Sequence, residues 1–212
     1  MKGVIFDLDG VLCFTDTFHY TAWKTIADEL HIPFNTEVNN KLRGVSRRES
    51  LEIILSSGQK KYTEEEKEVL MQKKNAIYRK LLTTLTPSDR AQGAAEILTY
   101  LRTQGRQIAI GSSSKNTKFI LQQLELTPYI DAVVDGNDIE NSKPDPEVFL
   151  KAAMTIGLDP HDCLVIEDAQ AGIDAANEGG FVSVSIGDAI NLQSSDYHIE
   201  GLLDLKKIMP LL

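Results

Sequence analysis

Five short apolar segments along the chain have the pattern of buried β-strands. They are rich in valine, isoleucine and leucine, and most of them show no alternation with polar residues. Near-continuous apolar runs of this kind are typical of parallel strands whose two faces are both covered. The five segments are residues 4–6, 107–110, 131–134, 163–166 and 182–186.

Helical periodicity fills the intervals between the later apolar segments. Strands that alternate with helices in this way predict an α/β fold, with a Rossmann-like parallel sheet as the core and helices on both faces. Ligands of such sheets bind beyond the carboxyl ends of the strands, so we expect the functional site at that edge. The helical segments are residues 94–103, 115–124, 146–156 and 169–178.

Residues 15–87 interrupt this alternation, because they show helical periodicity and no convincing strand. Within them, Thr63 and Glu66 have the spacing of a capping box, in which each side chain satisfies a free backbone N–H group at a helix start. We therefore predict two domains. An α/β catalytic core comprises residues 1–14 and 88–212, and an inserted all-helical cap domain comprises residues 15–87.

The composition is that of a soluble globular protein and narrows the function classes. Of the 212 residues, 42% are hydrophobic and 25% are charged. The formal net charge of -9 argues against nucleic acid as a partner. No apolar run reaches the roughly 20 residues that span a bilayer, and the chain begins on a strand pattern without the features of a signal peptide. We expect a cytoplasmic monomer without a membrane partner, in which Cys13 and Cys163 are free thiols.

Two aspartates at the end of the first apolar segment are the strongest chemical signal. Asp7 and Asp9 stand two residues apart, so in an extended chain their side chains share one face. A turn that begins at Gly10 can re-aim the second carboxylate. A strand end followed by a helix N-cap would also explain one aspartate here, but it explains the pair less well. We interpret Asp7 and Asp9 as candidate catalytic groups.

Three later motifs place further polar groups near strand ends. The run from Ser112 to Asn116 opens a helix, where hydroxyls and free N–H groups can hold phosphate, although a helix cap would explain any one of these residues. Lys143 lies in a proline-rich turn, where a lysine is usually solvated. Glu167 and Asp168 end the fourth segment. Four acids at one sheet edge repel each other without a cation, and oxygen ligands together with phosphate suit Mg²⁺.

In this order, the motifs resemble the four-motif pattern of the haloacid dehalogenase-like superfamily, over residues 4 to about 187. The resemblance implies that Asp7 attacks phosphorus and forms an aspartyl-phosphate, and that Asp9 is the general acid/base for the sugar oxygen. It implies that Ser112 and Lys143 bind the transferring phosphoryl group. It also implies a Mg²⁺ site, in which the ligands are Asp7, the backbone carbonyl of Asp9, and Asp168. Glu167 would be a further ligand or would contact one of the ligands.

The predicted cap carries polar residues on its apolar helical stripes. His19 lies on the stripe of Trp23, and Lys74 is in line with the apolar residues at 70, 77 and 81, with Asn75 beside that stripe. A lysine of this kind often only extends its charge to solvent, and a histidine is usually a satisfied core residue. Binding of a phosphorylated ligand beneath the cap would explain both residues together.

A basic turn at residues 43–50 is a further candidate in the cap. It contains Gly44 and Val45 and leads into a helix. One interpretation is a solvated loop in which Ser46 caps that helix. The alternative is a second anion site, in which the guanidinium of Arg47 forks onto a phosphate.

Together, the cap and core motifs resemble the β-phosphoglucomutase family. The resemblance implies interconversion of β-D-glucose 1-phosphate and glucose 6-phosphate through a bound β-glucose 1,6-bisphosphate. The phosphate-binding residues would be Ser112, Ser113, Ser114, Asn116, Lys143 and Arg47, of which Arg47, Ser114 and Asn116 hold the phosphate that is not reacting. The substrate-binding residues would be His19, Trp23, Gly44, Val45, Ser46, Ser50, Lys74 and Asn75. One departure is Cys13–Phe14, which stand where a small polar pair is expected at the hinge into the cap.

Two other functions share parts of this pattern. A Mg²⁺-dependent phosphatase acting on a sugar phosphate or phosphoglycolate would need the same core residues, but it would not need an arginine fork for a second phosphate. A binding protein on the same scaffold would have no use for a carboxylate beside the nucleophile. Since a fold hosts many functions, the choice depends on the site residues.

Overall fold

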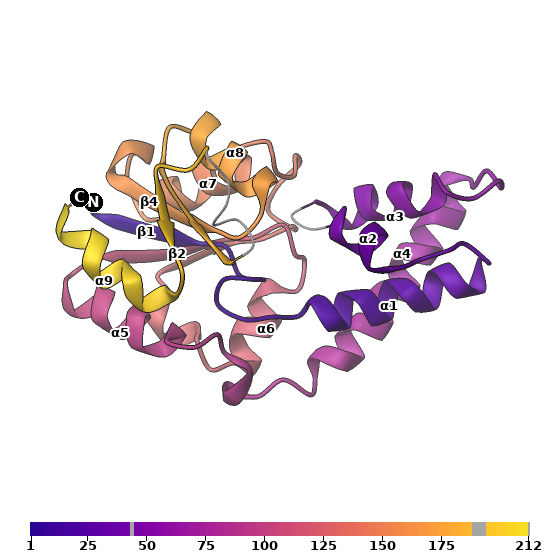
Figure 1. Cartoon of the computed structure of the whole chain (residues 1–212), viewed down its shortest axis with the longest axis horizontal. Coiled ribbons are helices and arrows are strands. Elements are labelled where there is room, and N and C mark those ends of the chain that lie inside the picture. Colours follow the sequence, from indigo (N-terminus) through magenta and orange to yellow (C-terminus); the bar gives the residue numbers. More distant parts are fainter. Residues whose placement is uncertain (43–44, 188–193, 212) are drawn as a thin grey trace.

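The computed structural model describes residues 1–42, 45–187 and 194–211 of the chain. Within these residues, six strands form one sheet in the order β3-β2-β1-β4-β5-β6, and every neighbouring pair is parallel (Figure 1). The predicted parallel α/β core is confirmed. The strands are β1 (Gly3–Phe6), β2 (Gln107–Gly111), β3 (Ala132–Val134), β4 (Cys163–Glu167), β5 (Val182–Ile186) and β6 (Tyr197–Ile199).

Helices cover both faces of the sheet, because alternate residues of each strand point to opposite sides. In β1, Val4 and Phe6 join a cluster that includes Ile97 of α5, whereas Ile5 joins a separate cluster that includes Phe149 of α7. Figure 1 shows α7 and α8 on one side of the sheet and α5 and α9 on the other. These helices are α5 (Ala94–Thr103), α6 (Thr117–Gln123), α7 (Glu147–Thr155), α8 (Gln170–Glu178) and α9 (Leu205–Ile208).

The chain between β1 and β2 is helical and packs around a cluster of its own. Trp23, Leu51 and Met71, from three different helices, are buried in that cluster. We call the four helices the cap; they lie beyond one edge of the sheet in Figure 1. Domain borders at residues 14/15 and 87/88 stay a prediction. The cap helices are α1 (Asp16–Glu29), α2 (Thr36–Asn40), α3 (Arg47–Leu55) and α4 (Glu64–Leu82).

Two chain segments connect the cap to the sheet, and they run side by side. The backbone N–H of Ala91 donates to the carbonyl of Leu12 over 2.8 Å. Cys13 forms β-bridges with Arg90 on the second segment and with Asp9 on its own. The entry to the cap and the exit from it are therefore fastened together a few residues from the candidate catalytic aspartates. Short 3₁₀ helices occupy Pro87–Asp89, Thr127–Tyr129, Pro160–Asp162, Leu202–Asp204 and Met209–Leu211.

The predicted strands and helices are confirmed with small shifts of their ends, and two details differ from expectation. The strand β6 was not predicted, because Tyr197–Ile199 is short and follows polar residues. The helix predicted over 115–124 begins only at Thr117, because serine hydroxyls accept the N–H groups of Ser114 and Asn116 and hold that stretch as a loop. Cys13 and Cys163 are buried free cysteines, as expected. No described helix is long and apolar enough to cross a membrane.

Candidate active site

A cavity of about 360 Å³ lies between the carboxyl edge of the sheet and the cap. From the sheet edge it is lined by Asp7 after β1 and Ser112 after β2, and from the cap by His19 and Arg47. Strands β1 and β4 are neighbours in the sheet, and Phe6 of β1 is in register with Ile166 of β4, so the residues that follow the two strands lie side by side. The site is thus assembled from strand ends on one side and from helix faces on the other.

Asp7 and Lys143 form a buried ion pair at the floor of the cavity. The Lys143 Nζ lies 2.5 Å from Asp7 Oδ1 and 3.0 Å from Glu167 Oε1. Burial raises the pKa of Asp7 to about 7, and the charges of Glu167 and Asp9 add to this while Lys143 opposes it. Burial also works against the charge on Lys143, but the two carboxylates outweigh it and raise its pKa. The lysine that the sequence placed in a turn is therefore a structural partner of the candidate nucleophile.

Glu167 is held from two sides. Its Oε1 accepts from Lys143, and its Oε2 accepts from the backbone N–H groups of Asp168 and Ala169, at 2.7 and 3.3 Å. A Cβ atom at Gly172 would meet the Glu167 carboxylate. A glycine at this position is what allows the acid to lie against helix α8.

Asp168 completes a group of three carboxylates. Asp7, Glu167 and Asp168 each offer one oxygen atom, and these atoms lie within 4.8 Å of one another. Gly10 has a φ of +87°, which glycine adopts readily, and a Cβ there would meet the Asp168 carboxylate. The tight turn after Asp9 therefore brings its backbone directly against the third acid. The side chain of Asp9 lies outside this group.

Asp9 is held by two residues at the start of the cap. The hydroxyl of Thr15 donates to Asp9 Oδ1, and His19 Nε2 lies 3.8 Å from Asp9 Oδ2. Burial would raise the pKa of Asp9, but the contacts with His19 and Thr15 and the charge on Lys74 lower it overall. The carboxylate form is favoured, which is the form that can accept a proton from a substrate hydroxyl.

A loop of serines lines the cavity after β2. The Ser112 hydroxyl accepts from the N–H of Ser114, and the Ser114 hydroxyl accepts from the N–H of Asn116, each at 3.3 Å. Ser112 and Asn116 are buried, and Ser113 also lines the cavity. The loop is held in shape by its own hydroxyls, and its serines line the cavity together with Asp7 and the cap residues.

A chain of hydrogen bonds connects the cap to this serine loop. Arg47 Nη2 and Asn116 Nδ2 both donate to Asn75 Oδ1 over 2.9 Å. Arg79 Nη1 donates to Asn116 Oδ1 over 3.3 Å, and its guanidinium lies 4.4 Å from the centroid of the Phe119 ring. Burial lowers the pKa of Arg47. Helix α4 therefore reaches across to the start of α6, and Arg47 is held at the junction.

Lys74 is buried in the cap against an imidazole and two aromatic rings. Its Nζ lies 2.9 Å from His19 Nδ1, and it faces the rings of Trp23 and Tyr78 at 5.0 and 4.4 Å. Only 2% of the residue is exposed. Burial, together with the charge of Arg47, lowers the pKa of Lys74 to about 7. In His19, burial and the charge of Lys74 lower the pKa of the imidazole.

Comparison with known proteins identifies the family to which the chain belongs. Residues 4–186 match the model of a family described as haloacid dehalogenase-like hydrolase. The chain belongs to this family. The resemblance inferred from the motifs is confirmed, and the match covers strands β1 to β5 and the cap.

Individual members of the haloacid dehalogenase-like family are similar over almost the whole chain. A β-phosphoglucomutase of Bacillus subtilis is 42% identical over 97% of this chain and 92% of its own length. The crystal structure of a β-phosphoglucomutase from Clostridium difficile superposes with a TM-score of 0.95, at 36% identity, and the match covers 99% of this chain and 96% of the other. A phosphorylated carbohydrates phosphatase of Thermotoga maritima is 28% identical over 85% of this chain and 82% of its own length.

The structure brings most of the residues chosen from the sequence to one cavity of this haloacid dehalogenase-like fold. Val45, Ser46 and Ser50 line it from the cap. Ser46 also caps α3 in a capping box with Glu49, so both readings of that turn have a physical basis. Gly44 lies outside the described residues. Asn75 reaches the site through Arg47 and Asn116. The buried stripe of α4 is not the predicted one, because it consists of Met71, Lys74, Tyr78 and Leu82, with residues 70, 77 and 81 half-buried.

Three residues of the site were missed in the sequence. Thr15 bonds Asp9, Tyr78 bonds Thr15, and Arg79 bonds Asn116. Tyr78 follows Lys74 by four residues, so it lies one helical turn further on the same face, and that spacing was the available signal. Nothing in the sequence pairs α4 with the loop before α6, so Arg79 carried no signal.

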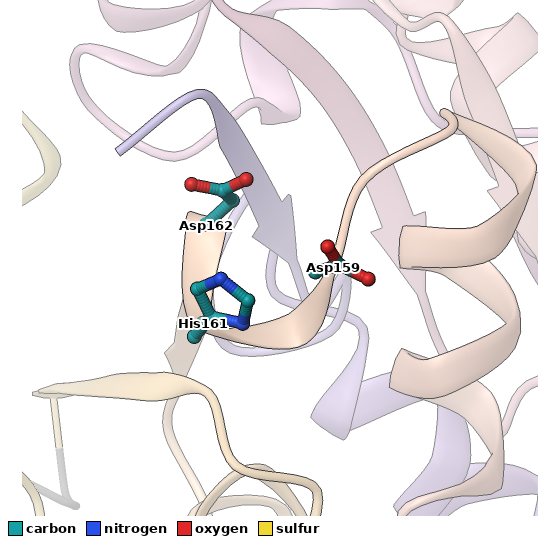
Figure 2. Close-up of side chains that lie close together, drawn as sticks. All are labelled: Asp159, His161 and Asp162. Atoms are coloured by element: carbon teal, nitrogen blue, oxygen red, sulfur yellow. The ribbon is translucent and has the colours of Figure 1, made fainter.

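A second group of possible metal ligands lies at the other end of β4. Figure 2 shows Asp159, His161 and Asp162 around the short turn that precedes this strand. Their ligand atoms also lie within 4.8 Å of one another. Lys2 pairs with Asp162 at 2.8 Å, and acidic groups as exposed as these are common without a metal ion. We assign no role to this group.

Proposed function

We propose that the protein is a phosphomutase that interconverts β-D-glucose 1-phosphate and glucose 6-phosphate through an aspartyl-phosphate and β-glucose 1,6-bisphosphate. One observation carries the proposal. Two cap cations, Arg47 and Lys74, line the same cavity as Asp7, and neither has an ion-pair partner among the described residues. The similarity to the two β-phosphoglucomutases named above supports it.

The unpaired cap cations support a second anion site. Transfer of a charged group from water into a protein costs free energy that only a partner of opposite charge offsets well. Arg47 and Lys74 instead contact an amide, an imidazole and aromatic rings. A phosphate bound here would supply the missing negative charge. A ligand with two phosphates would then place one of them at Asp7 and the other at Arg47, Ser114 and Asn116.

The chemistry proceeds at the sheet edge. A carboxylate oxygen of Asp7 attacks phosphorus, a new O–P bond forms, and the bond from phosphorus to the sugar oxygen breaks. The leaving sugar oxygen takes a proton from the Asp9 carboxyl group. In the other half-reaction, the 6-hydroxyl of β-glucose 1-phosphate gives its proton to the Asp9 carboxylate and attacks the aspartyl-phosphate, the bond from phosphorus to Asp7 breaks, and the bisphosphate forms again. Ser112 and Lys143 hold the phosphoryl oxygens, and Lys143 offsets their charge.

The residues at the floor of the cavity fit a magnesium ion. Their donors are all oxygen atoms, and the acids outnumber the lysine that pairs with them. Asp7, Asp168 and the backbone carbonyl of Asp9 would hold Mg²⁺, with Glu167 as the partner that orients Lys143. When bound, the ion neutralises charge on the transferring phosphoryl group.

The sugar would lie between the two phosphate sites. His19 and Trp23 of α1, Ser50 of α3 and Lys74 of α4 line this part of the cavity from the cap, and Val45 and Ser46 lie beside them. Asn75 would act here through its bonds to Arg47 and Asn116. Because all of these groups belong to the cap, the cap would set the choice of sugar.

A product analysis tests the proposal. The enzyme is given β-glucose 1-phosphate, Mg²⁺ and a trace of the bisphosphate, and glucose 6-phosphate and free phosphate are measured in the same samples. We expect glucose 6-phosphate to be the main product and the α-anomer to react poorly. Free phosphate as the main product would favour a sugar-phosphate phosphatase, and Asp7→Asn is the control that must abolish either product.

A further inference from the structure

The loop that follows β3 lies against the serine loop and binds its backbone. We call residues 135–138 the bracing loop. The N–H of Gly136 donates to the carbonyl of Ser114 over 3.2 Å. The side-chain Nδ2 of Asn137 donates to the carbonyl of Lys115 over 3.1 Å. Two successive carbonyls of the serine loop therefore point toward the bracing loop.

The direction of these carbonyls fixes the direction of the neighbouring N–H groups. The carbonyl of Ser113 faces the same way, since a Cβ atom at Gly136 would lie 2.3 Å from its oxygen. The peptide bonds of the serine loop are trans, so each N–H points opposite to the carbonyl that precedes it. The N–H groups of Ser114, Lys115 and Asn116 consequently point away from the bracing loop.

These N–H groups point to the side on which the serine hydroxyls lie. The N–H groups of Ser114 and Asn116 donate to the hydroxyls of Ser112 and Ser114, and both serines line the cavity. The N–H of Lys115, between them in the chain, has no hydrogen-bond partner among the described residues. Successive N–H groups on one side of a loop favour a bound anion. The brace thus turns the backbone into a form that suits phosphate.

Asn137 is itself held in one orientation. Its backbone N–H and its Nδ2 donate to Asp135 Oδ1 over 2.8 and 2.9 Å. Asp135 is buried, and its own N–H donates to Asp138 Oδ2 over 2.9 Å. Both neighbours of the amide nitrogen, the Asp135 carboxylate and the Lys115 carbonyl, can only accept. The amide therefore cannot turn over without losing both bonds.

The brace acts on one end of the serine loop only. Ser112 is held separately, because its N–H donates to the carbonyl of Val134 over 3.1 Å and continues the pairing of β2 with β3. The other end of the loop reaches the cap, since Asn116 bonds Asn75 and Arg79. A change in the bracing loop should disturb the end that meets the cap and spare Ser112.

We propose that Asn137 is a positioning residue, which together with Gly136 holds the serine loop so that its N–H groups face the phosphate that is not reacting. The inference rests on the proposed function, which places that phosphate at Arg47, Ser114 and Asn116. It adds a support for this anion site from the core, through a side chain that does not itself line the cavity.

Asn137→Ala removes the amide, and the discharge of phosphorylated Asp7 measures the consequence. Acetyl phosphate first loads Asp7: the O–P bond to Asp7 forms, the bond from phosphorus to acetate breaks, and acetate leaves. The loaded enzyme is discharged in two ways. The 6-hydroxyl of β-glucose 1-phosphate gives its proton to Asp9 and takes the phosphoryl group, or water does the same and yields free phosphate. Only the sugar phosphate needs the second anion site.

We expect Asn137→Ala to weaken the use of the sugar phosphate alone. The concentration of β-glucose 1-phosphate that gives half-maximal discharge should rise roughly three- to tenfold, the effect of one lost hydrogen bond. The maximal rate should stay within about twofold of wild type, because the contact is made equally before and during transfer. Loading and discharge by water should also stay within about twofold.

Two further variants frame this result, and thermal melts check that each is folded. Asn141→Ala is the matched control, since Asn141 is exposed and its side chain has no hydrogen bond among the described residues. It should behave as wild type. Gly136→Ala would press a Cβ atom onto the Ser113 carbonyl and should raise the half-maximal concentration further.

The inference and the proposed function can fail separately in this experiment. An unchanged half-maximal concentration in Asn137→Ala would overturn the inference. So would equal losses in discharge by the sugar phosphate and by water, which would indicate a general structural role. A wild-type enzyme that β-glucose 1-phosphate discharges no faster than water does would refute the proposed function, and the inference with it.

Discussion

The two walls of the cavity carry their charges in opposite ways. At the sheet edge, Lys143 is paired with Asp7 and Glu167 at 2.5 and 3.0 Å. On the cap, Arg47 and Lys74 contact only neutral groups among the described residues. The sheet edge is organised before any substrate arrives, whereas the cap has positive charge that only a bound anion would balance.

In the proposed mechanism, this difference separates the reaction from the recognition of the substrate. The groups at the sheet edge are fixed by strand register and by close glycine contacts, and in the proposed mechanism they carry out the phosphoryl transfer. The cap groups lie on helix faces, and they suit the part of the substrate that does not react. A change at the sheet edge should therefore affect every reaction of the enzyme, and a change in the cap should affect mainly the choice and retention of substrate.

Asp7→Asn should have the largest effect and test the sheet edge directly. The amide cannot attack phosphorus, so we expect mutase activity and loading by acetyl phosphate both to fall to background, while the protein stays folded. Assays of mutase activity and of loading test this prediction, and a thermal melt checks that the variant is folded. A folded and active Asp7→Asn variant would refute the nucleophile assignment.

Removal of magnesium should be nearly as damaging. We expect turnover to stop in excess chelator and to return when Mg²⁺ is added back. Ca²⁺ should bind but support little activity, because it accepts looser geometry and more ligands than Mg²⁺. Turnover is measured during titration with each ion. Full activity in excess chelator would contradict the metal site.

Arg47→Ala should separate the two walls. A desolvated, charge-assisted contact is worth about 2–5 kcal/mol, and about 1.4 kcal/mol corresponds to a factor of ten, so we expect mutase turnover to fall at least tenfold. Loading of Asp7 by acetyl phosphate should change much less, because it uses the sheet edge alone. Arg47→Lys should recover only part of the loss, since an ammonium group cannot form the fork.

The same two measurements, mutase turnover and loading of Asp7, can also show that the two walls do not differ in this way. Equal losses in mutase turnover and in loading by the Arg47→Ala variant would mean that Arg47 supports the cap structure. No loss in either would make it a solvated residue, and a phosphatase would then be the better description of the enzyme.

Lys74→Met should have the smallest effect of these changes. It should alter the free energy of unfolding by an amount that depends on pH. The pKa of Lys74 is lowered to about 7 in the folded chain, from 10.5 for an ordinary lysine. Between these values the unfolded chain binds more protons, so the stability of the wild type rises with pH relative to the variant. We expect the variant to be the more stable protein at and below about pH 7. Its advantage should shrink toward alkaline pH.

Urea unfolding of both proteins across this pH range provides the measurement for Lys74. Lys73→Met is a suitable control, because Lys73 is exposed and pairs with Glu29 on the cap surface. An advantage of Lys74→Met that is constant with pH, or that grows as the pH rises, would show that the buried lysine carries no charge penalty.

Local sequence patterns were sufficient to predict the parallel core. Apolar runs followed by acids or serines predicted five strands and the edge where the site lies. The strand β6 was not predictable in this way, because Tyr197–Ile199 gains its place by pairing with β5 and carries no long apolar run. The order of the strands also depends on long-range packing that no single segment encodes.

The residues of the site fall into the same two groups: those that a local pattern predicts, and those whose role depends on contacts between distant segments. Asp7, Asp9, Glu167 and Asp168 could be chosen because strand ends converge in a parallel sheet, and Lys143 followed from its motif. The bond between Tyr78 and Thr15 joins residues 63 positions apart, and the bonds that hold Asn75 and Arg79 to Asn116 join the cap to the core. Contacts between separate segments of this kind leave no periodic pattern in either segment, so they had to come from the structure.

The pairing of Leu12 with Ala91 has a consequence for how enzymes of this shape can diversify. The inserted segment leaves and re-enters the sheet at neighbouring points, so its ends need not move when its interior is lengthened or replaced. A replaced segment would bring its own recognition surface and its own support for Asp9, while the sheet edge kept its reaction. Substrate preference and phosphoryl chemistry can thus evolve as two exchangeable pieces of one gene.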